Sequence, residues 1–293
     1  MNELDRRRAM KHALGAAGGL WASMHGRALL AAPAPARGKA VSDLVPLGNT
    51  GIKLSRMAMG TGTNGVRKSS VQARLGLRGL GQLLARGYDQ GLTFWDTADQ
   101  YGTHEHLREG MRQVGKNNVV VLTKTRARTA AEMKSDLDRF RRELGRDHLD
   151  IVLLHCMTTD NWNKELAGPM EVLSRAREQG VVRAHGVSCH TLGALKTAAK
   201  EPWVQVDLAR INAAQAEMDA DPATVLAVLR QMKAAGKAII GMKIFGAGKL
   251  SHDTDRALRY CAANQLLDAF TIGFANQHQL DEVVRKFSAV QTA

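Results

Sequence analysis

The chain has 293 residues, 44% of them hydrophobic, and it carries a formal net charge of +13 at pH 7. This length suits one α/β barrel of about 250 residues or two small domains. No basic run is interleaved with aromatic residues, so we expect no nucleic-acid binding despite the charge. The cysteines, Cys156, Cys189 and Cys261, are widely spaced and form no C-x-x-C motif, so neither a zinc site nor an iron–sulfur cluster is indicated.

Residues 1–36 have the features of an export signal. A basic start with paired Arg6 and Arg7 is followed by a weakly apolar run rich in Gly and Ala, and then by AAPAPA, which offers A-x-A cleavage positions. This order resembles a twin-arginine signal, and the run is too short and too rich in glycine to span a membrane. A disordered or amphipathic basic tail is the alternative. We therefore expect a mature domain of residues 37–293 in the periplasm, or in the cytoplasm if the signal is misread.

The segment after the signal predicts a hairpin and then a regular series of strands. Residues 43–56 (DLVPLGNTGIKLSR) contain two apolar runs around a Gly-Asn-Thr-Gly turn, which is typical of a β-hairpin. Eight short apolar runs then predict strands. These runs are residues 56–62, 92–98, 119–125, 150–156, 183–189, 203–212, 238–246 and 269–275.

The segments between these runs predict helices, because their apolar residues recur at i, i+3, i+4 and i+7. The clearest are residues 130–144, 168–180 and 222–236. Thr129 and Asp221 precede two of these segments, as helix N-caps do, and Thr191 is a third such residue. Apolar strands that alternate with amphipathic helices imply a parallel sheet covered by helices, and eight units predict a closed (β/α)8 TIM barrel. A doubly wound open sheet is the alternative.

Polar residues interrupt three successive strands at their carboxyl ends. The second run delivers Asp96, with Tyr101 five residues later, and the next two runs deliver Lys124 and His155. Active sites of barrels lie where the strands end, so we expect these four side chains to meet. Asp96 would compensate a buried Lys124, and the ammonium would lower the pKa of the Tyr101 phenol. Such a phenol could donate its proton to a carbonyl oxygen that His155 orients, while hydride reaches the carbon.

The hairpin followed by WDTADQYG, LTKT, LLH and GVS resembles the aldo-keto reductase superfamily over about residues 45–287. The resemblance implies a (β/α)8 barrel whose N-terminal hairpin closes the bottom. It implies Asp96, Tyr101, Lys124 and His155 as a catalytic tetrad, with Tyr101 as proton donor. It also implies NADPH, or NADH, as a cofactor that binds without a Rossmann fold, and a small carbonyl compound or alcohol as substrate.

The resemblance further implies contacts to the nicotinamide. Gly62 and Thr63, in the first loop after a strand, would lie near the ring together with Asp96. Ser188 and Cys189 occupy the positions that hold the carboxamide, where the family usually has Ser-Asn. This departure weakens the expected cofactor contacts.

Later cofactor contacts depart further from the family pattern. Met242 stands where the family has a tyrosine that stacks on the nicotinamide, and a thioether packs less specifically on a ring face. Lys243 could reach a phosphate, and the helix start at Asn276 could bind an anion through its free N–H groups. The basic residues that bind the 2′-phosphate are absent from residues 272–283, so the choice between NADP and NAD stays open.

Other candidates lie beside the tetrad. Trp162, on the loop after the fourth strand, could form a wall of the substrate pocket. His104 and His106 flank Glu105, but no third ligand stands at a useful spacing, so we expect no metal site.

The leading functional hypothesis is NAD(P)H-dependent reduction of an aldehyde or ketone, reversible toward alcohol oxidation. A nicotinamide-nucleotide-binding sensor or accessory subunit with little turnover is the second, because the nicotinamide contacts are weakened. A periplasmic barrel that binds or isomerises sugars is the third. Export would require the cofactor to be recycled by the substrate pair or by a redox partner.

Overall fold

The computed structural model describes residues 39–290, so the predicted export signal lies outside the described residues. The strands of this part are β1 Leu44–Pro46, β2 Lys53–Ser55, β3 Met57–Gly60, β4 Phe94–Asp96, β5 Val120–Thr125, β6 Leu149–Met157, β7 Val182–Cys189, β8 Val206–Arg210, β9 Ala238–Met242 and β10 Ala269–Gly273. Its α-helices are α1 Gly76–Asp89, α2 His104–Val114, α3 Ala130–Leu144, α4 Trp162–Glu165, α5 Ala167–Glu178, α6 Leu192–Lys200, α7 Pro222–Ala234, α8 Thr254–Ala263 and α9 Gln277–Ala289. Three short 3-10 helices are η1 Ala73–Leu75, η2 Asp99–Tyr101 and η3 Gly246–Gly248.

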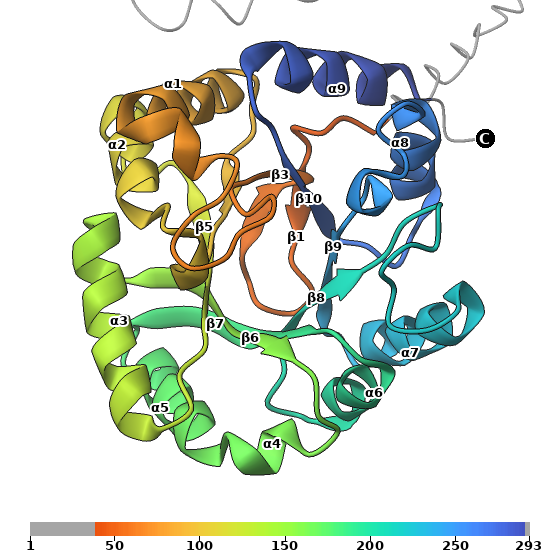
Figure 1. The fold of residues 1–293 in the computed structure, drawn as a ribbon. Helices are drawn as coiled ribbons and strands as arrows, with labels where there is room; N and C mark the ends of the chain where they lie inside the picture. The colour runs from red at the N-terminus through yellow and green to blue at the C-terminus, as the bar shows by residue number, and fades with distance from the viewer. Residues whose placement is uncertain (1–38, 291–293) are drawn as a thin grey trace, which may run out of the picture. The chain divides into compact units, whose positions relative to one another are not determined.

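Strands β3 to β10 form a closed barrel of parallel strands in the order β10-β3-β4-β5-β6-β7-β8-β9. Helices surround the strands, as Figure 1 shows. The (β/α)8 barrel predicted from the sequence is therefore confirmed, and each of its eight strands falls within or overlaps a predicted apolar run. The runs are apolar throughout because each strand packs against the barrel interior on one face and against helices on the other.

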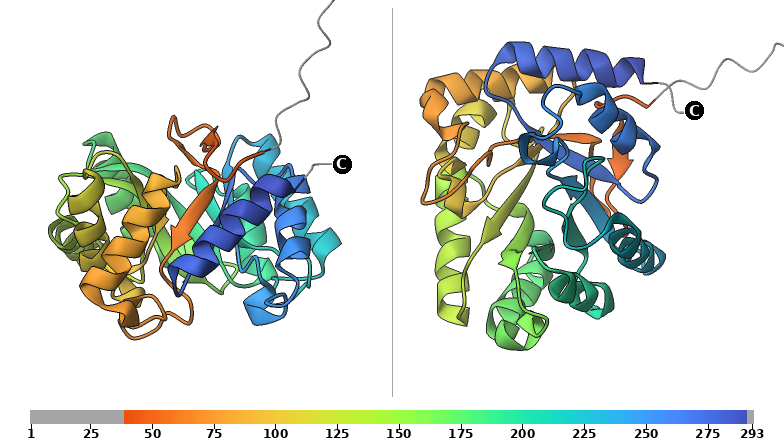
Figure 2. Two further views of the ribbon diagram at one scale, coloured as in Figure 1. Left: turned by 90° about the horizontal axis from the view of Figure 1, so that it is seen from above. Right: turned by 45° about the vertical axis from the view of Figure 1, so that its right-hand side comes forward.

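The hairpin of β1 and β2 closes the amino end of the barrel. The two strands pair antiparallel, with Leu44 opposite Ser55. Leu47, Ile52 and Leu54 are fully buried and belong to the same apolar cluster as the inward side chains of the barrel strands. Figure 2 (left) shows this red-orange segment at one end of the barrel, with the arrow of β3 pointing away from it. The opposite end, where the strands finish, is left open for the loops that carry polar residues.

Local capping explains where several of these helices begin. Thr129 and Glu132 form a reciprocal capping box at the start of α3. The side chains of Thr191 and Asp221 accept hydrogen bonds from the backbone N–H groups of Ala194 and Thr224, respectively. The predicted N-caps are thus confirmed. No helix within residues 39–290 is both long enough and apolar enough to cross a membrane.

Candidate active site at the carboxyl end of the barrel

A buried ion pair joins the ends of β4 and β5. These strands are neighbours, and Lys124 Nζ donates hydrogen bonds to Asp96 Oδ1 at 2.5 Å and to the Thr97 carbonyl at 2.7 Å. Asp96 Oδ2 accepts a hydrogen bond from Thr271 Oγ1 at 3.0 Å. Burial by itself would lower the pKa of Lys124, but Asp96 and Tyr101 together outweigh burial, so the pKa of Lys124 is raised. Lys124 therefore stays a cation in a fully buried position.

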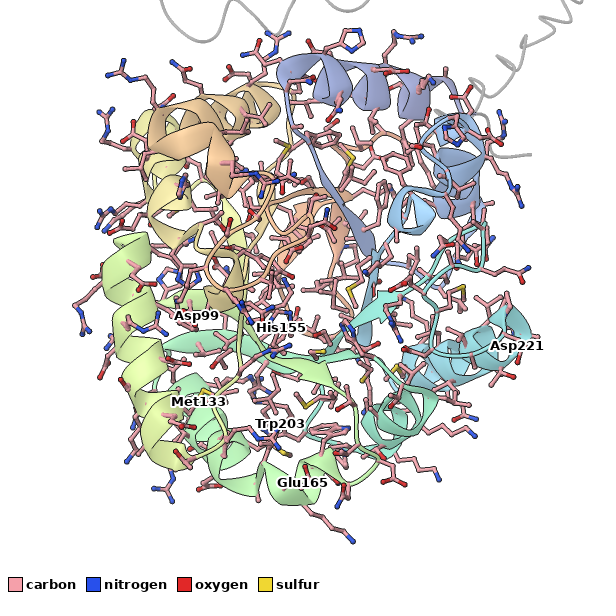
Figure 3. All side chains as sticks on the ribbon, viewed as in Figure 1. Asp99, Met133, His155, Glu165, Trp203 and Asp221 are labelled. Atoms are coloured by element: carbon pink, nitrogen blue, oxygen red, sulfur yellow. The ribbon has the colours of Figure 1, made fainter. Side chains whose placement is uncertain are left out.

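The Tyr101 ring packs between this ion pair and His155. Lys124 Nζ lies 4.8 Å from the centroid of the Tyr101 ring, and the His155 ring meets Tyr101 edge-on with centroids 5.7 Å apart. His155 lies at the end of β6, the next strand after β5, close to the centre of the barrel in Figure 3. The structure thus brings the four residues of the predicted tetrad to one place at the barrel mouth.

Two glycines of the loop between β3 and η1 fit against the Tyr101 ring. A Cβ atom at Gly62 would lie 2.2 Å from Tyr101 Cε2, and one at Gly65 would lie 2.3 Å from Tyr101 Cδ1. Gln100 Nε2 also donates to the Gly65 carbonyl at 3.0 Å. The loop and the Tyr101 segment therefore pack as one unit, and a side chain at either glycine would displace the phenol. Gly62 thus contacts the candidate proton donor itself.

Lys124 lowers the pKa of Tyr101 as expected, but the net acidification expected for Tyr101 is wrong. Burial raises the pKa of the Tyr101 phenol, and the ammonium of Lys124 opposes this without overcoming it. The carboxylate of Asp96, which accepts a hydrogen bond from that ammonium, also raises the pKa of Tyr101. The phenol is consequently neutral near pH 7 and retains the proton that a general acid must donate.

His155 is also neutral. Burial, followed by the positive charges of Lys124 and Arg126, lowers the pKa of His155 to about 2. The buried Nδ1 atom of His155 has no hydrogen-bond partner within residues 39–290. A neutral imidazole can donate one hydrogen bond to a substrate oxygen.

A cavity of about 440 Å³ opens beside His155. It is lined by the carboxyl ends of β5 and β6 and by the loops that follow them. The lining residues are Thr125, Arg126, Ala127, Arg128, Leu154, His155, Cys156, Met157, Thr158 and Leu166. A space of this size accepts a small organic molecule.

Sequence reasoning did not find the hydroxyl groups that hold the ion pair in place. Thr103 Oγ1 lies 2.8 Å from Thr61 Oγ1 and 2.7 Å from Thr97 Oγ1, and Thr61 Oγ1 donates to the Asp96 carbonyl at 3.0 Å. Together with Thr271, these residues fix the end of β4. An inward-facing threonine within an apolar strand run, as in the AFTIG of β10, is the signal that could have pointed to Thr271.

Thr63 and Ser188 lie at the mouth but already make protein contacts. The Thr63 amide donates to Gln72 Oε1 at 3.0 Å, and Thr63 Oγ1 accepts from Gln72 Nε2 at 3.0 Å. Ser188 Oγ accepts from the Cys156 amide at 2.9 Å, next to a left-handed Cys156 backbone with φ of 67°. The Ser188 hydroxyl hydrogen remains available as a donor. These contacts hold both residues in place beside the tetrad.

The ends of β9 and β10 carry the remaining cofactor candidates. Met242 packs against the apolar cluster inside the barrel, and Lys243 Nζ lies 3.7 Å from Glu217 Oε2. Asn276 caps α9 by accepting a hydrogen bond from the Gln279 amide. The amides that precede Gln279 at the start of α9 have no partner within the helix and can bind an anion. An apolar surface, a lysine and a free helix start fit the ring and the phosphates of a nicotinamide dinucleotide.

Two predicted site residues lie elsewhere. Cys189 is fully buried, and its side chain belongs to the apolar layer between the strands and the helices. Successive residues of a strand face opposite sides, so Cys189 faces away from the mouth that Ser188 faces. Trp162 is only 1% exposed, and its indole N–H donates to the Ala194 carbonyl of α6 at 3.2 Å. The predictions that Cys189 contacts a cofactor and that Trp162 lines the substrate pocket are therefore wrong.

His104 belongs to an ion-pair network outside the tetrad. Its Nδ1 and Nε2 atoms lie 2.6 Å from Glu143 Oε2 and 2.7 Å from Thr123 Oγ1, respectively. The side chains of Asp99, His104 and Glu143 come within 4.8 Å of one another, as metal ligands do. However, the guanidinium of Arg139 pairs with both Asp99 and Glu143, so a cation already occupies this position.

Comparison with known proteins decides the family. The sequence profile of the Aldo/keto reductase family matches residues 56–289. The chain belongs to the aldo/keto reductase family. No match was found among curated proteins.

Solved structures of other aldo-keto reductases share the fold. A candidate aldo-keto reductase from Pseudomonas aeruginosa is 20% identical, with a TM-score of 0.72, over 87% of this chain and 98% of its own. An aldo-keto reductase from Bacillus halodurans in its holo form is 14% identical, with a TM-score of 0.68, over 83% of this chain and 90% of its own. At these identities the likeness concerns the fold, whereas membership of the aldo/keto reductase family supports an oxidoreductase that acts on carbonyl compounds.

Proposed function

We propose that this aldo/keto reductase reduces an aldehyde or ketone with NADPH, with NADH as the alternative cofactor, and catalyses the reverse oxidation of an alcohol. The observation that carries the proposal is the convergence of Asp96, Tyr101, Lys124 and His155 beside a cavity. When bound, the reduced nicotinamide supplies the hydride. Met242, Lys243, Ser188 and the start of α9 would hold it.

Tyr101 is the proposed proton donor. As the carbonyl carbon gains hydride, its oxygen gains negative charge, and the phenolic O–H of Tyr101 transfers its proton to that oxygen. The product is an alcohol and a tyrosinate. The ammonium of Lys124, 4.8 Å from the ring centroid, stabilises the tyrosinate as its charge develops. Asp96 keeps that ammonium charged in a buried site.

The neutral imidazole of His155 would donate a hydrogen bond to the carbonyl oxygen and orient it toward Tyr101. An imidazolium would compete with Tyr101 as the acid. The low pKa of His155, caused first by burial and then by nearby cations, prevents this over the whole neutral range.

The test is a panel of aldehydes and ketones assayed by the fall in NADPH absorbance at 340 nm, for wild type, Tyr101→Phe and Tyr88→Phe. Tyr88 lies on α1 and packs against the outer apolar layer, so it provides a matched control. We expect Tyr101→Phe to lower kcat by about 100- to 10,000-fold and Tyr88→Phe to leave it within about twofold. Equal rates for wild type and Tyr101→Phe would refute the donor role.

We also propose, from the basic start and the A-x-A positions of residues 1–36, that the protein is exported to the periplasm in folded form. A Lys-Lys replacement of Arg6 and Arg7 would keep the charge and abolish a twin-arginine signal. Unchanged export of this variant, measured by cell fractionation, would contradict the proposal.

A further inference from the structure

The cavity beside His155 has a cation at its edge. Arg126 directly follows β5 and is two residues beyond Lys124. Its side chain is solvent-exposed, whereas Lys124 is fully buried.

Arg126 reaches beyond its own strand. Its positive charge lowers the pKa of both His155, at the end of β6, and His190, which follows β7. Arg126 lines the same cavity as His155 and Cys156. A ligand in this cavity would contact it.

The carboxylates around the cavity are already engaged with other partners. Glu165 pairs with Arg128, the other arginine of the lining, at 3.7 Å. Glu132 accepts hydrogen bonds from the backbone at the start of α3, and Asp136 pairs with Arg139. Within residues 39–290, none of the ion pairs around this cavity includes Arg126.

We infer that Arg126 binds the carboxylate of the substrate, and that the substrate is a small aldehyde or ketone that carries a carboxylate a few atoms from its carbonyl group. A planar guanidinium binds a carboxylate through two parallel N–H···O bonds, which a lysine cannot make. The carbonyl end would lie against Tyr101 and His155, and the carboxylate would lie at the open end of the cavity. This inference rests on the proposed function.

The cofactor does not account for Arg126. The candidate phosphate contacts, Lys243 and the start of α9, lie at the ends of β9 and β10, whereas Arg126 lies at the end of β5. Three strands, β6, β7 and β8, separate β5 from β9 on one side of the barrel, and β3 and β4 separate it from β10 on the other. Arg126 is thus on the side of the mouth that remains for the substrate.

The experiment compares 4-carboxybenzaldehyde with its neutral isostere 4-formylbenzamide, using wild type, Arg126→Ala, Arg126→Lys and a control, Arg112→Ala. Arg112 lies on α2 and pairs with Glu109. We expect wild type to favour the carboxylate in kcat/KM by about 10- to 100-fold, through KM, as a charge-assisted hydrogen bond implies. Arg126→Ala should abolish this preference for the carboxylate. Arg126→Lys should keep part of the preference, and Arg112→Ala should keep all of it.

Binding of 4-carboxybenzaldehyde, measured by calorimetry, gives a second readout that needs no turnover. Binding that is lost in Arg126→Ala but kept in Arg112→Ala, without turnover in wild type, would support Arg126 and refute the proposed function. Turnover of both aldehydes with equal kcat/KM in wild type would refute the inference and leave the proposed function standing. Equal losses for both aldehydes in Arg126→Ala would also overturn it, because the arginine would then have only a structural role.

Discussion

Replacing Lys124 by Met should destabilise the protein strongly, because it leaves a buried carboxylate without its cation. The Lys124 side chain is 0% exposed and that of Asp96 is 7% exposed, and their atoms are 2.5 Å apart. Removal of one partner from a buried pair costs about 3 to 5 kcal/mol. We therefore expect the free energy of unfolding to fall by about this amount near pH 7.

The double variant Lys124→Met/Asp96→Asn removes both charges, so it should recover part of the loss, with a coupling of at least about 1 kcal/mol. Lys134→Met, at an exposed position of α3, is the control and should change stability by less than about 0.5 kcal/mol. Urea denaturation followed by tryptophan fluorescence measures these three variants and Asp96→Asn, the other single variant that the coupling requires. A loss below about 1 kcal/mol in Lys124→Met, or strictly additive losses in the double variant, would refute the reasoning.

The pH dependence of this pair follows from the direction of its pKa shift. Because the pKa of Lys124 is raised on folding from 10.5, its contribution to stability is complete below about pH 10.5 and is lost as the pH rises through the folded pKa. On the alkaline side, the difference in stability between wild type and Lys124→Met should accordingly begin to shrink only above about pH 10.5.

Three other predictions concern the described core and mouth. Gly62→Ala should lower kcat by tenfold or more in the 340 nm assay, because the added Cβ would displace the Tyr101 ring. The control Gly79→Ala on α1 should leave kcat unchanged, because the added Cβ would meet only Leu75, at 3.5 Å. Asp207 is fully buried, its oxygens lack partners within residues 39–290, and burial raises its pKa to about 7. The contribution of Asp207 to wild-type stability should therefore fall as the pH rises from about 4 to 7, by up to about 1.4 kcal/mol per pH unit. Asp207→Asn should lose that slope in urea denaturation, and an unchanged slope would contradict the assignment. Iodoacetamide should modify the half-buried Cys156 before the buried Cys189 and Cys261. Mass spectrometry of the labelled native protein measures this order, and equal labelling of the three cysteines would contradict their difference in burial.

Periodic and local features were predictable from the sequence. The eight strands follow from continuous apolar runs, and the starts of α3, α6 and α7 follow from the capping residues Thr129, Thr191 and Asp221. The tetrad was predictable because three adjacent parallel strands must end at one rim. Each of these inferences needs only the spacing of residues along the chain.

Features that depend on three-dimensional packing were not predictable. Trp162 was placed on a loop, but the segment forms α4 and its indole packs against α6. Cys189 was assigned a cofactor contact because it stands where the family usually has the Asn of a Ser-Asn pair, but its side chain is buried in the apolar layer outside the strands. The pKa of Tyr101 depends on how deeply the ring is buried, which the distance of five residues from Asp96 does not reveal.

The contact between Tyr101 and the two glycines connects the proposed proton donor to a surface loop. Gln100 bonds to the Gly65 carbonyl, and the Lys68 amide bonds to the Gln100 carbonyl at 2.8 Å, so the connection is made by backbone as well as by the ring. A molecule that displaced residues 62–68 would also displace the Tyr101 ring, because the ring packs against Gly62 and Gly65. The rate of the proposed reaction would then depend on what binds to residues 62–68 at the outer surface.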